Sequence, residues 1–373
     1  MNCLVAGYFG ERSRPHGGTQ YVRNLLENPP SDVNYSIPRA KLEWHNLDIF
    51  GFLKNQKVSN ASEVQYYRRL EAVNRLLRWR TKEFRAFRGV EDDVDLVFYN
   101  QGLISTKKPY VSCVEGDYIL TNNPEHSPLK DIDMRSPLAR AYQRIVLKHF
   151  LLNKNLRKIL FWSDKARTES LKLFPEIKEK SCILYPPVCM PKKKLRRDGD
   201  TVRLLFIGGD WARKGLLVLT EAFARLSKRF DVTLSVVTED SFRSVESEPG
   251  ISVYSNLAHD QVFPRMYLDH DVFVLPSRFE TFGYSILEAM ACALPVISTD
   301  VYAIPELVED GVSGYLTPYG DSHSLAEKLS ELVEDASLRR KMGDAGRRQA
   351  DEKSSVPVFT KKLDRIYGES LNP

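Results

Sequence analysis

The stretch Pro276-Ser-Arg-Phe-Glu280-Thr-Phe-Gly283-Tyr-Ser-Ile-Leu-Glu288-Ala-Met-Ala291 decides the fold of this 373-residue chain. It follows a continuous apolar run, Val272–Leu275, and its second half has helical apolar spacing. Continuous apolar runs are typical of strands buried on both faces of a parallel sheet. The stretch therefore predicts a strand, a polar loop and a helix, and in such folds ligands bind beyond the carboxyl ends of the strands.

Glu280 and Glu288 occupy different parts of this unit. Glu280 lies in the loop, and Glu288 lies roughly 7–8 Å along a helix that would begin near Gly283. The two carboxylates suit the two ends of an elongated ligand, with a phosphate near the amides at Gly283 and a ribose at Glu288. The alternative is that Glu288 is an exposed helix residue, but its neighbours from 286 to 291 are apolar.

A second glycine-rich stretch, Phe206-Ile-Gly208-Gly209-Asp-Trp-Ala-Arg213-Lys214-Gly215, also stands between an apolar run and a helical pattern. Gly208 and Gly209 allow a tight exit from a strand. Arg213 and Lys214 would lie at a helix N-terminus, where a diphosphate is favoured. The spacing is neither GxGxxG nor GxxxxGK[ST], so a dinucleotide fingerprint and a P-loop are excluded. A basic surface turn is the alternative.

The whole chain alternates short apolar runs with helical patterns, which predicts an α/β fold with two doubly wound parallel sheets. Its length suits two domains. Proline and charge at the seam divide it into an N-terminal domain (1–188), a linker (189–200) and a C-terminal domain (201–352), followed by a helix (353–373) that could cross back. The two domains would face each other across a cleft.

The apolar runs and helical patterns give the expected elements. Strands are predicted at 3–7, 96–100, 110–114 and 159–163, and at 203–207, 233–238, 252–255, 272–275 and 296–298. Helices are predicted at 18–27, 62–88, 137–153 and 165–174, and at 215–229, 259–268, 283–293 and 303–309.

The net charge of +5 is concentrated in residues 61–90, where eight Lys/Arg oppose three Glu at helical spacing. The helix predicted at 62–88 therefore has an apolar face and a basic face. It is either a solvated surface helix on the N-terminal sheet or a helix that contacts anionic lipid headgroups. No nucleic-acid-binding motif accompanies the charge, so nucleic acid is not expected as a partner.

Cysteine, histidine and aspartate patterns give no support for a metal site. The five cysteines form no CxxC pair, and the seven histidines show no HxH or HExxH spacing. The pairs Asp93/Asp95 and Asp269/Asp271 precede strands, and Asp131/Asp133 falls in a loop. We predict no essential metal and no cofactor. With no leader and no apolar run of 18 residues, a cytoplasmic location is expected, with the inner membrane face as a peripheral site.

The segment Glu280-x7-Glu288 resembles the EX7E signature of family 4 of the GT-B glycosyltransferases. The segments Pro295-Val-Ile-Ser-Thr, Ile304-Pro-Glu-Leu-Val and Gly311-Val-Ser-Gly-Tyr-Leu are similar to the same family. The resemblance is strong over about 201–335 and looser over 1–190. It implies the GT-B fold, with two Rossmann-like domains, and a retaining transfer of sugar from a nucleotide-diphosphate sugar.

The resemblance also implies roles for individual residues. Glu280 would contact the transferred sugar, Lys214 the diphosphate and Glu288 the donor ribose. The family usually has an arginine where Gly209 stands, and Arg213 is the nearest substitute. The implied donor-binding residues are Gly208, Gly209, Phe282, Gly283, Tyr284 and Glu288, and the implied catalytic residues are Glu280, Lys214 and Arg213.

Two segments of the N-terminal half complete the candidate site. Gly17 and Gly18 are similar to the family's glycine-rich loop near the donor phosphate and the acceptor, although a plain turn explains them as well. Glu115 and Asp117 follow the strand expected at 110–114, where the family often has a histidine. They would take a polar role toward sugar or acceptor.

These observations predict a metal-independent glycosyltransferase in polysaccharide or glycan assembly, with a saccharide or a lipid-linked saccharide as acceptor. The transition state carries positive charge on the sugar and negative charge on the leaving diphosphate, which Lys214 and Arg213 would stabilise. Two alternatives remain, a nucleotide-sugar epimerase of the same fold and a catalytically silent nucleotide-sugar-binding scaffold.

Overall fold

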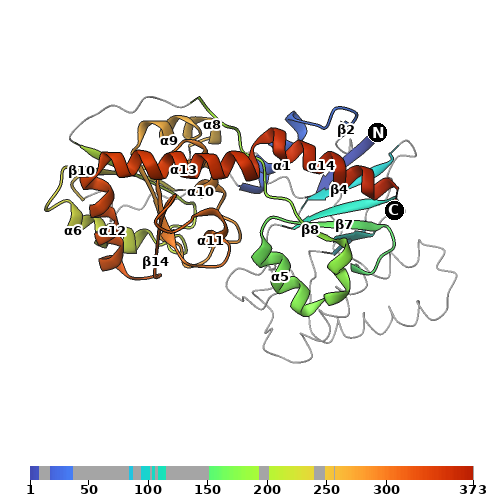
Figure 1. Ribbon diagram of the computed structural model, residues 1–373, viewed down its shortest axis with the longest axis horizontal. Coiled ribbons are helices and arrows are strands. Elements are labelled where there is room, and N and C mark those ends of the chain that lie inside the picture. The colour runs from blue at the N-terminus through green and yellow to red at the C-terminus, as the bar shows by residue number, and fades with distance from the viewer. Residues whose placement is uncertain are drawn as a thin grey trace.

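The computed structural model describes residues 1–7, 17–36, 84–86, 94–100, 103–105, 108–114, 151–192, 201–238, 248–255 and 257–372. These residues form two lobes that lie side by side (Figure 1). Each lobe contains a six-stranded sheet, with strand orders β2-β1-β4-β6-β7-β8 and β11-β10-β9-β12-β13-β14. The strand pairings of the described residues within the two sheets are all parallel. The predicted α/β class with two doubly wound parallel sheets is confirmed.

The N-terminal lobe takes its described elements from the first half of the chain and from the C-terminal helix. They are β1 (Asn2–Gly7), α1 (Gly17–Glu27), β2 (Asn34–Ser36), β4 (Leu96–Asn100), β6 (Tyr110–Val114), β7 (Leu156–Phe161), α5 (Asp164–Leu173), η2 (Pro175–Lys180), β8 (Ser181–Ile183) and α14 (Val356–Leu371). Two further strands, β3 (Phe84–Ala86) and β5 (Leu103–Ser105), pair with each other outside the main sheet.

The C-terminal lobe follows the strand–helix alternation read from the sequence. Its elements are β9 (Val202–Ile207), α6 (Leu216–Leu226), β10 (Val232–Thr238), β11 (Ile251–Ser255), α8 (His259–Val262), α9 (Arg265–Asp269), β12 (Val272–Leu275), α10 (Tyr284–Ala291), β13 (Val296–Thr299), α11 (Ile304–Leu307), β14 (Gly314–Thr317), α12 (Ser322–Glu334) and α13 (Ala336–Ser354).

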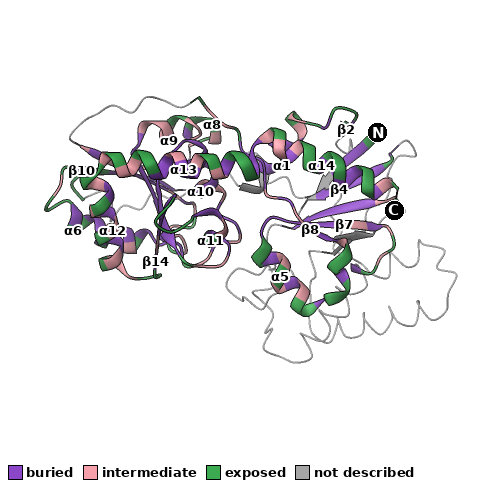
Figure 2. Cartoon of the chain, viewed as in Figure 1, coloured by how far each residue is buried: buried purple, intermediate pink, exposed green. Residues whose placement is uncertain are grey.

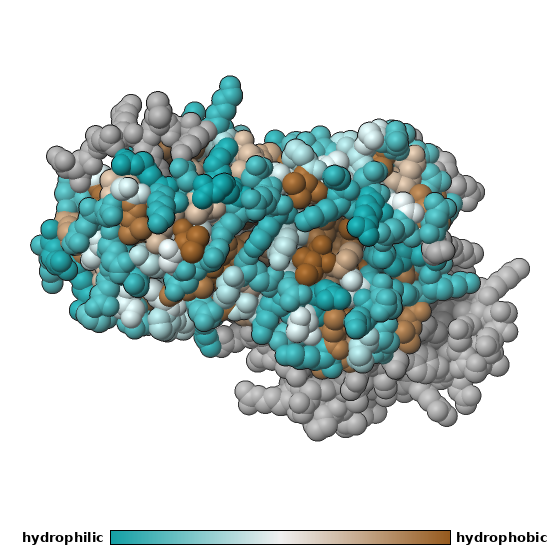
Figure 3. Space-filling model, in the orientation of Figure 1, coloured by the Kyte–Doolittle hydropathy of each residue, from teal (hydrophilic) through white to brown (hydrophobic). Residues whose placement is uncertain are grey.

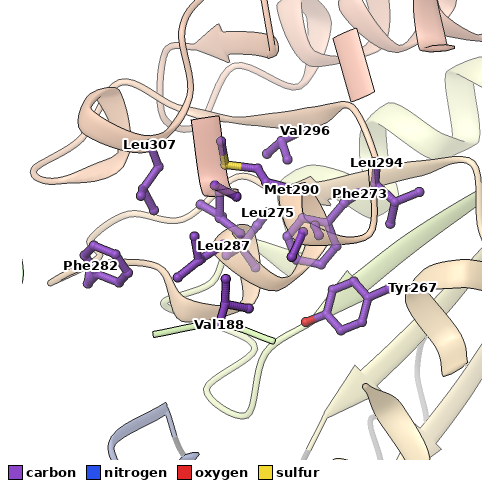
Figure 4. Close-up of a cluster of buried hydrophobic side chains, with 14 of the residues drawn as sticks. Val188, Tyr267, Phe273, Leu275, Phe282, Leu287, Met290, Leu294, Val296 and Leu307 are labelled. Carbon is purple, nitrogen blue, oxygen red and sulfur yellow. The ribbon is translucent and has the colours of Figure 1, made fainter. Parts of the chain in front are cut away.

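The core of the C-terminal lobe explains why its strands are continuously apolar. All residues of β12 and β13 are buried, because helices cover both faces of the sheet. Figure 4 shows side chains of β12, α10 and β13 gathered in one cluster. Val188, at the end of the N-terminal domain, lies close to Leu287 in the same view. Figure 2 shows the same pattern throughout the fold, with buried strands and helices whose outer faces are exposed. The strand β12 and the helix α10 are thereby fixed on either side of the loop 276–283.

The chain crosses between the lobes twice, and the two crossings meet. The amide of Val188 donates to the carbonyl of Ser354, 2.8 Å away. From this point α14 runs back over the N-terminal lobe, where both chain ends lie (Figure 1). There the hydroxyls of Tyr35 and Tyr367 are 3.0 Å apart, and Lys158 forms an ion pair with Glu369 at 3.0 Å.

Three sequence predictions need correction. The basic helix expected at 62–88 cannot extend through its end, because residues 84–86 form strand β3; residues 62–83 lie outside the described residues. The helix expected at 259–268 is two short helices, α8 and α9. Phe263, the residue before Pro264, has an extended backbone, as residues before proline generally do. The short strands β2, β8 and β14 were not predicted, because none of them is a continuous apolar run like β12.

The surface of the described residues shows no long apolar helix. On the face seen in Figure 3 it is mostly hydrophilic, and its hydrophobic atoms form small separate groups. Among the helices of the described part of the chain, none has both the length and the apolar character that a bilayer span needs. The helix expected at 137–153 lies outside the described residues up to position 150.

Candidate functional site

Sheet topology brings the two glycine-rich stretches together. Strand β12 pairs with β9, although they are about 70 residues apart in the chain. The loops that follow these two parallel strands therefore leave from the same edge of the sheet. The amide of Arg278 donates to the carbonyl of Arg213 across 2.8 Å, which joins the two loops directly.

Gly215 lets these loops approach closely. It precedes α6 with φ of 78°, a left-handed conformation that favours glycine. A Cβ atom added there would lie 2.0 Å from the carbonyl oxygen of Pro276. Gly283 takes the same place before α10, with φ of 93°. Both helices of the site thus begin at a glycine that no other residue can replace without strain.

Replacement of Gly215 by alanine is expected to lower the free energy of unfolding by at least about 2 kcal/mol, because it combines backbone strain with a clash against backbone. Urea denaturation measures this loss. Gly320→Ala is the matched control, since Gly320 has φ of 83° but nothing within 4 Å of an added Cβ. Equal losses in the two variants would show that the contact with Pro276 is not tight.

Glu280 is the acceptor around which the first cluster forms. Its side chain is buried, with 4% exposed, and the Nζ of Lys214 donates directly to its Oε1. The hydroxyl of Ser277 donates to the same oxygen over 3.0 Å, and a guanidinium nitrogen of Arg213 lies 3.5 Å from it. Two cations and one carboxylate are therefore assembled at the end of β12.

Arg213 is held from two sides. Its Nε donates to the carboxylate of Asp210 at 3.3 Å, and its terminal NH donates to the carbonyl of Phe279 at 2.7 Å. The guanidinium is consequently oriented by these two protein groups. Its place beside Lys214 fits the role expected for it as a substitute for the arginine missing at 209, and the role itself remains a prediction.

Gly208 and Gly209 shape the floor of this cluster. A Cβ atom on Gly208 would come within 2.8 Å of the Cγ of Lys214, so the lysine stem packs against bare backbone. The carbonyl of Gly209 accepts from the hydroxyl of Thr238 at 3.2 Å. An arginine side chain at position 209 is not needed to complete these contacts.

Glu288 forms a second cluster on α10. It is 5% exposed, so the alternative of a surface residue is wrong. The hydroxyl of Tyr267 donates to its Oε2 over 2.7 Å, and the Nε2 of His259 lies 2.6 Å from its Oε1. Burial, and next the nearby carboxylate of Glu288, raise the pKa of Tyr267 well above its ordinary value, which keeps the phenol a donor.

The N-terminus of α10 touches the N-terminal lobe. The hydroxyl of Tyr284 donates to the carbonyl of Pro187, and the side-chain amide of Asn24 in α1 donates to that hydroxyl at 3.0 Å. Phe282 is buried against the rings of Trp162 and Tyr185, with centroids 6.0 and 6.1 Å away. Phe282 and Tyr284 thus contact residues of the other lobe.

The N-terminal candidates are only partly described. Gly17 and Gly18 form the first residues of α1. Glu115 and Asp117 lie outside the described residues, so their predicted role has no structural counterpart here.

Within the described ranges, no group of three or more His, Cys, Asp or Glu is arranged to hold a metal ion. Of the Asp pairs singled out in the sequence, Asp271 accepts three hydrogen bonds from Arg203, at 2.9 to 3.2 Å. Asp95 accepts from the amide of Asn2 at 2.8 Å. These two aspartates have partners within the fold.

Sequence reasoning missed His259, Tyr267, Ser277 and Asn24. His259 and Tyr267 precede Glu288 by 29 and 21 residues and belong to no local motif. Ser277 stands inside the quoted stretch, where a hydroxyl three residues before Glu280 was an available signal.

A known protein family matches the C-terminal part of the chain. Residues 201–335 match the family described as glycosyl transferases group 1. The capsular polysaccharide biosynthesis glycosyltransferase CapM of Staphylococcus aureus is 30% identical over 182 residues, 46% of this chain and 47% of that protein. An MMP alpha-(1->4)-mannosyltransferase of Mycolicibacterium hassiacum is 26% identical over 403 residues, 96% and 97% of the two chains. In its matches with CapM and with the uncharacterized glycosyltransferase MJ1178 of Methanocaldococcus jannaschii, the chain spans about half the length of the relative.

Solved structures of similar fold align with almost the whole length of the chain. Anabaena HepE in complex with UDP and glucose superposes with a TM-score of 0.66 at 15% identity, covering 98% of this chain and 99% of HepE. WaaG, a glycosyltransferase involved in lipopolysaccharide biosynthesis, gives 0.63 at 18% identity, with 99% and 100% covered. The GT-B fold expected from the motifs is confirmed.

Proposed function

Because residues 201–335 match the family of group 1 glycosyl transferases, we propose that this chain moves a sugar from a nucleotide-diphosphate sugar to an acceptor hydroxyl. The activity serves the assembly of a polysaccharide or another glycan, as the names of relatives such as CapM suggest. The single observation that carries the proposal is the convergence of Lys214 and Arg213 on Glu280 at the end of β12.

The donor lies along the loop and first turn of α10. Its ribose hydroxyls bind Glu288, whose two oxygens keep lone pairs beyond those used by His259 and Tyr267. Its diphosphate binds Lys214 and Arg213. A uridine diphosphate sugar is the first candidate, because HepE was solved with UDP and glucose.

The ion pair of Lys214 with Glu280 offers a way for donor binding to prepare the reaction. Lys214 is paired with Glu280, and an incoming diphosphate exchanges this partner for phosphate oxygens. Glu280 then turns its free carboxylate toward the sugar, near the carbon at which positive charge develops. Cations fixed in a buried site stabilise the leaving diphosphate far more than they would in water.

The transfer proceeds with retention of configuration. The acceptor hydroxyl attacks from the face that the diphosphate leaves, the glycosyl–phosphate bond breaks, and a phosphate oxygen accepts the proton. Glu280 orients the sugar and stabilises its developing positive charge, without forming a bond to it. No metal is required, since Lys214 and Arg213 supply the positive charge.

The acceptor is a saccharide or a lipid-linked saccharide that the N-terminal lobe binds. The enzyme works in the cytoplasm, and the basic segment 62–88 brings it to anionic lipid at the inner membrane face.

A thermal-shift screen against nucleoside diphosphates and their sugars tests the proposal. A ligand at about a hundred times its dissociation constant should add roughly 2.7 kcal/mol of stability. The stabilising donor, incubated with candidate acceptors in the presence of a chelator, should give a glycosylated product. Conversion of the donor alone to an isomer would identify an epimerase, and binding without turnover would identify a scaffold; either result contradicts transfer.

A further inference from the structure

A carboxylate of the C-terminal lobe caps a helix of the N-terminal lobe. Glu306, in α11, accepts hydrogen bonds from the amides of Asp164 and Lys165, the first two residues of α5, each over 2.7 Å. Its Oε2 also accepts from the hydroxyl of Tyr185 at 3.0 Å. Three donors of one lobe therefore converge on one side chain of the other.

The cap of α5 is shared between the two lobes. The side chain of Ser163, the helix's own N-cap residue, accepts from the amide of Ala166 at 3.1 Å. Glu306 accepts from the amides of Asp164 and Lys165, which as the first amides of a helix have no acceptor within it. The charged carboxylate also lies at the positive end of the α5 dipole. Separation of the lobes would expose both amides and the carboxylate together.

The segment that carries Glu306 also contacts the phosphate cluster. Tyr302 packs against the hydrophobic core of the N-terminal lobe, and its ring centroid lies 5.0 Å from that of Phe279. The carbonyl of Phe279 accepts from Arg213 at 2.7 Å. On the other side, Lys353 of α13 donates to the backbone carbonyl of Glu306 at 2.8 Å. Residues 302–306 thus connect α5 with the loop that holds Glu280.

We propose that Glu306 is a positioning residue that holds the two lobes in the arrangement in which sugar transfer occurs. The inference rests on the proposed function, since transfer requires donor and acceptor groups from facing lobes to meet. Glu306 touches neither of them. It acts through α5 and through the contact of Tyr302 with Phe279.

The first test is hydrogen exchange on the Glu306→Gln variant. A glutamine offers a single acceptor oxygen and turns its NH2 toward a helix amide, so the shared cap fails. Exchange of the amides at 164 and 165 should become about tenfold faster. Glu309→Gln is the matched control: Glu309 follows on the same segment, but its carboxylate binds Gln349 within its own lobe. Unchanged exchange in Glu306→Gln would overturn the proposal.

The second test separates positioning from donor binding. In Glu306→Gln the kcat for transfer should fall about tenfold, while the dissociation constant of the nucleoside diphosphate, which the C-terminal lobe binds, should stay within about twofold. Tyr185→Phe, which removes one of the three donors, should give a smaller fall in kcat. An unchanged kcat despite faster exchange would also overturn the proposal. If the unaltered protein shows no transfer, the proposed function fails, whereas the exchange test still decides whether Glu306 holds the lobes together.

Discussion

Replacement of Lys214 by alanine is expected to lower the kcat of sugar transfer about 100- to 1000-fold. A preorganised charge that stabilises a developing anion in a buried site contributes an effect of this size. The side chain of Lys214 is only 14% exposed, so water cannot fully replace it. The KM for the donor should change much less than kcat, because the charge acts mainly on the leaving diphosphate. Steady-state kinetics with varied donor at a saturating acceptor concentration measures both constants.

Lys328→Ala is the matched control for this variant. Lys328 also forms an ion pair with a glutamate, Glu331, at 2.8 Å, but the pair is more exposed and lies on α12, away from the site. Its removal should leave kcat unchanged. A Lys214→Ala enzyme with a rate close to that of the original would exclude the lysine from the mechanism.

Glu288→Gln is expected to weaken the binding of the nucleoside diphosphate at least about 100-fold. The substitution keeps the volume of the side chain but removes the charge that accepts the two ribose hydroxyls, and hydrogen bonds to charged groups contribute about 1.5–3 kcal/mol each. One of its two partners, Tyr267 or His259, would also face an NH2 group. Isothermal titration calorimetry measures the affinity directly.

Glu331→Gln is the matched control for Glu288→Gln, because it also replaces a glutamate that accepts from a tyrosine. Its carboxylate binds the hydroxyl of Tyr315, as Glu288 binds that of Tyr267, but it is partly exposed. The affinity for the nucleoside diphosphate should not change in this variant. If Glu288→Gln binds as tightly as the original protein, the ribose does not lie at Glu288.

The strand, loop and helix around Glu280 could be predicted because local signals agree there. Four apolar residues in a row predict β12, glycine at 283 marks the start of α10, and the helical spacing after it buries one face. The burial of Glu288 could be predicted in the same way, from its apolar neighbours. These features depend on residues within about ten positions of one another.

The partners of the two glutamates could not be predicted, because they depend on strand order. Lys214 meets Glu280 only because β9 lies beside β12 in the sheet. His259 lies in α8 and Tyr267 in α9, two short helices that the sequence pattern predicted as one continuous helix. Their positions follow from tertiary packing, for which one sequence gives no periodic signal.

Contacts between the lobes are the part of the structure that the sequence predicts least. Glu306 was noted as part of a family segment, and nothing in its local pattern indicates that it caps a helix about 140 residues earlier. The strand β3 at Phe84–Ala86 was read as the end of a basic helix, since three residues are too few to alter a helical pattern.

The most direct test of the account is a crystal structure of the protein bound to UDP, or to whichever nucleoside diphosphate stabilises it most. We expect both ribose hydroxyls to donate to Glu288. We expect the diphosphate oxygens to accept from Lys214 and Arg213, with Lys214 withdrawn from Glu280. A nucleotide bound elsewhere, or a Lys214 that remains on Glu280 while the diphosphate lies apart from it, would contradict the account.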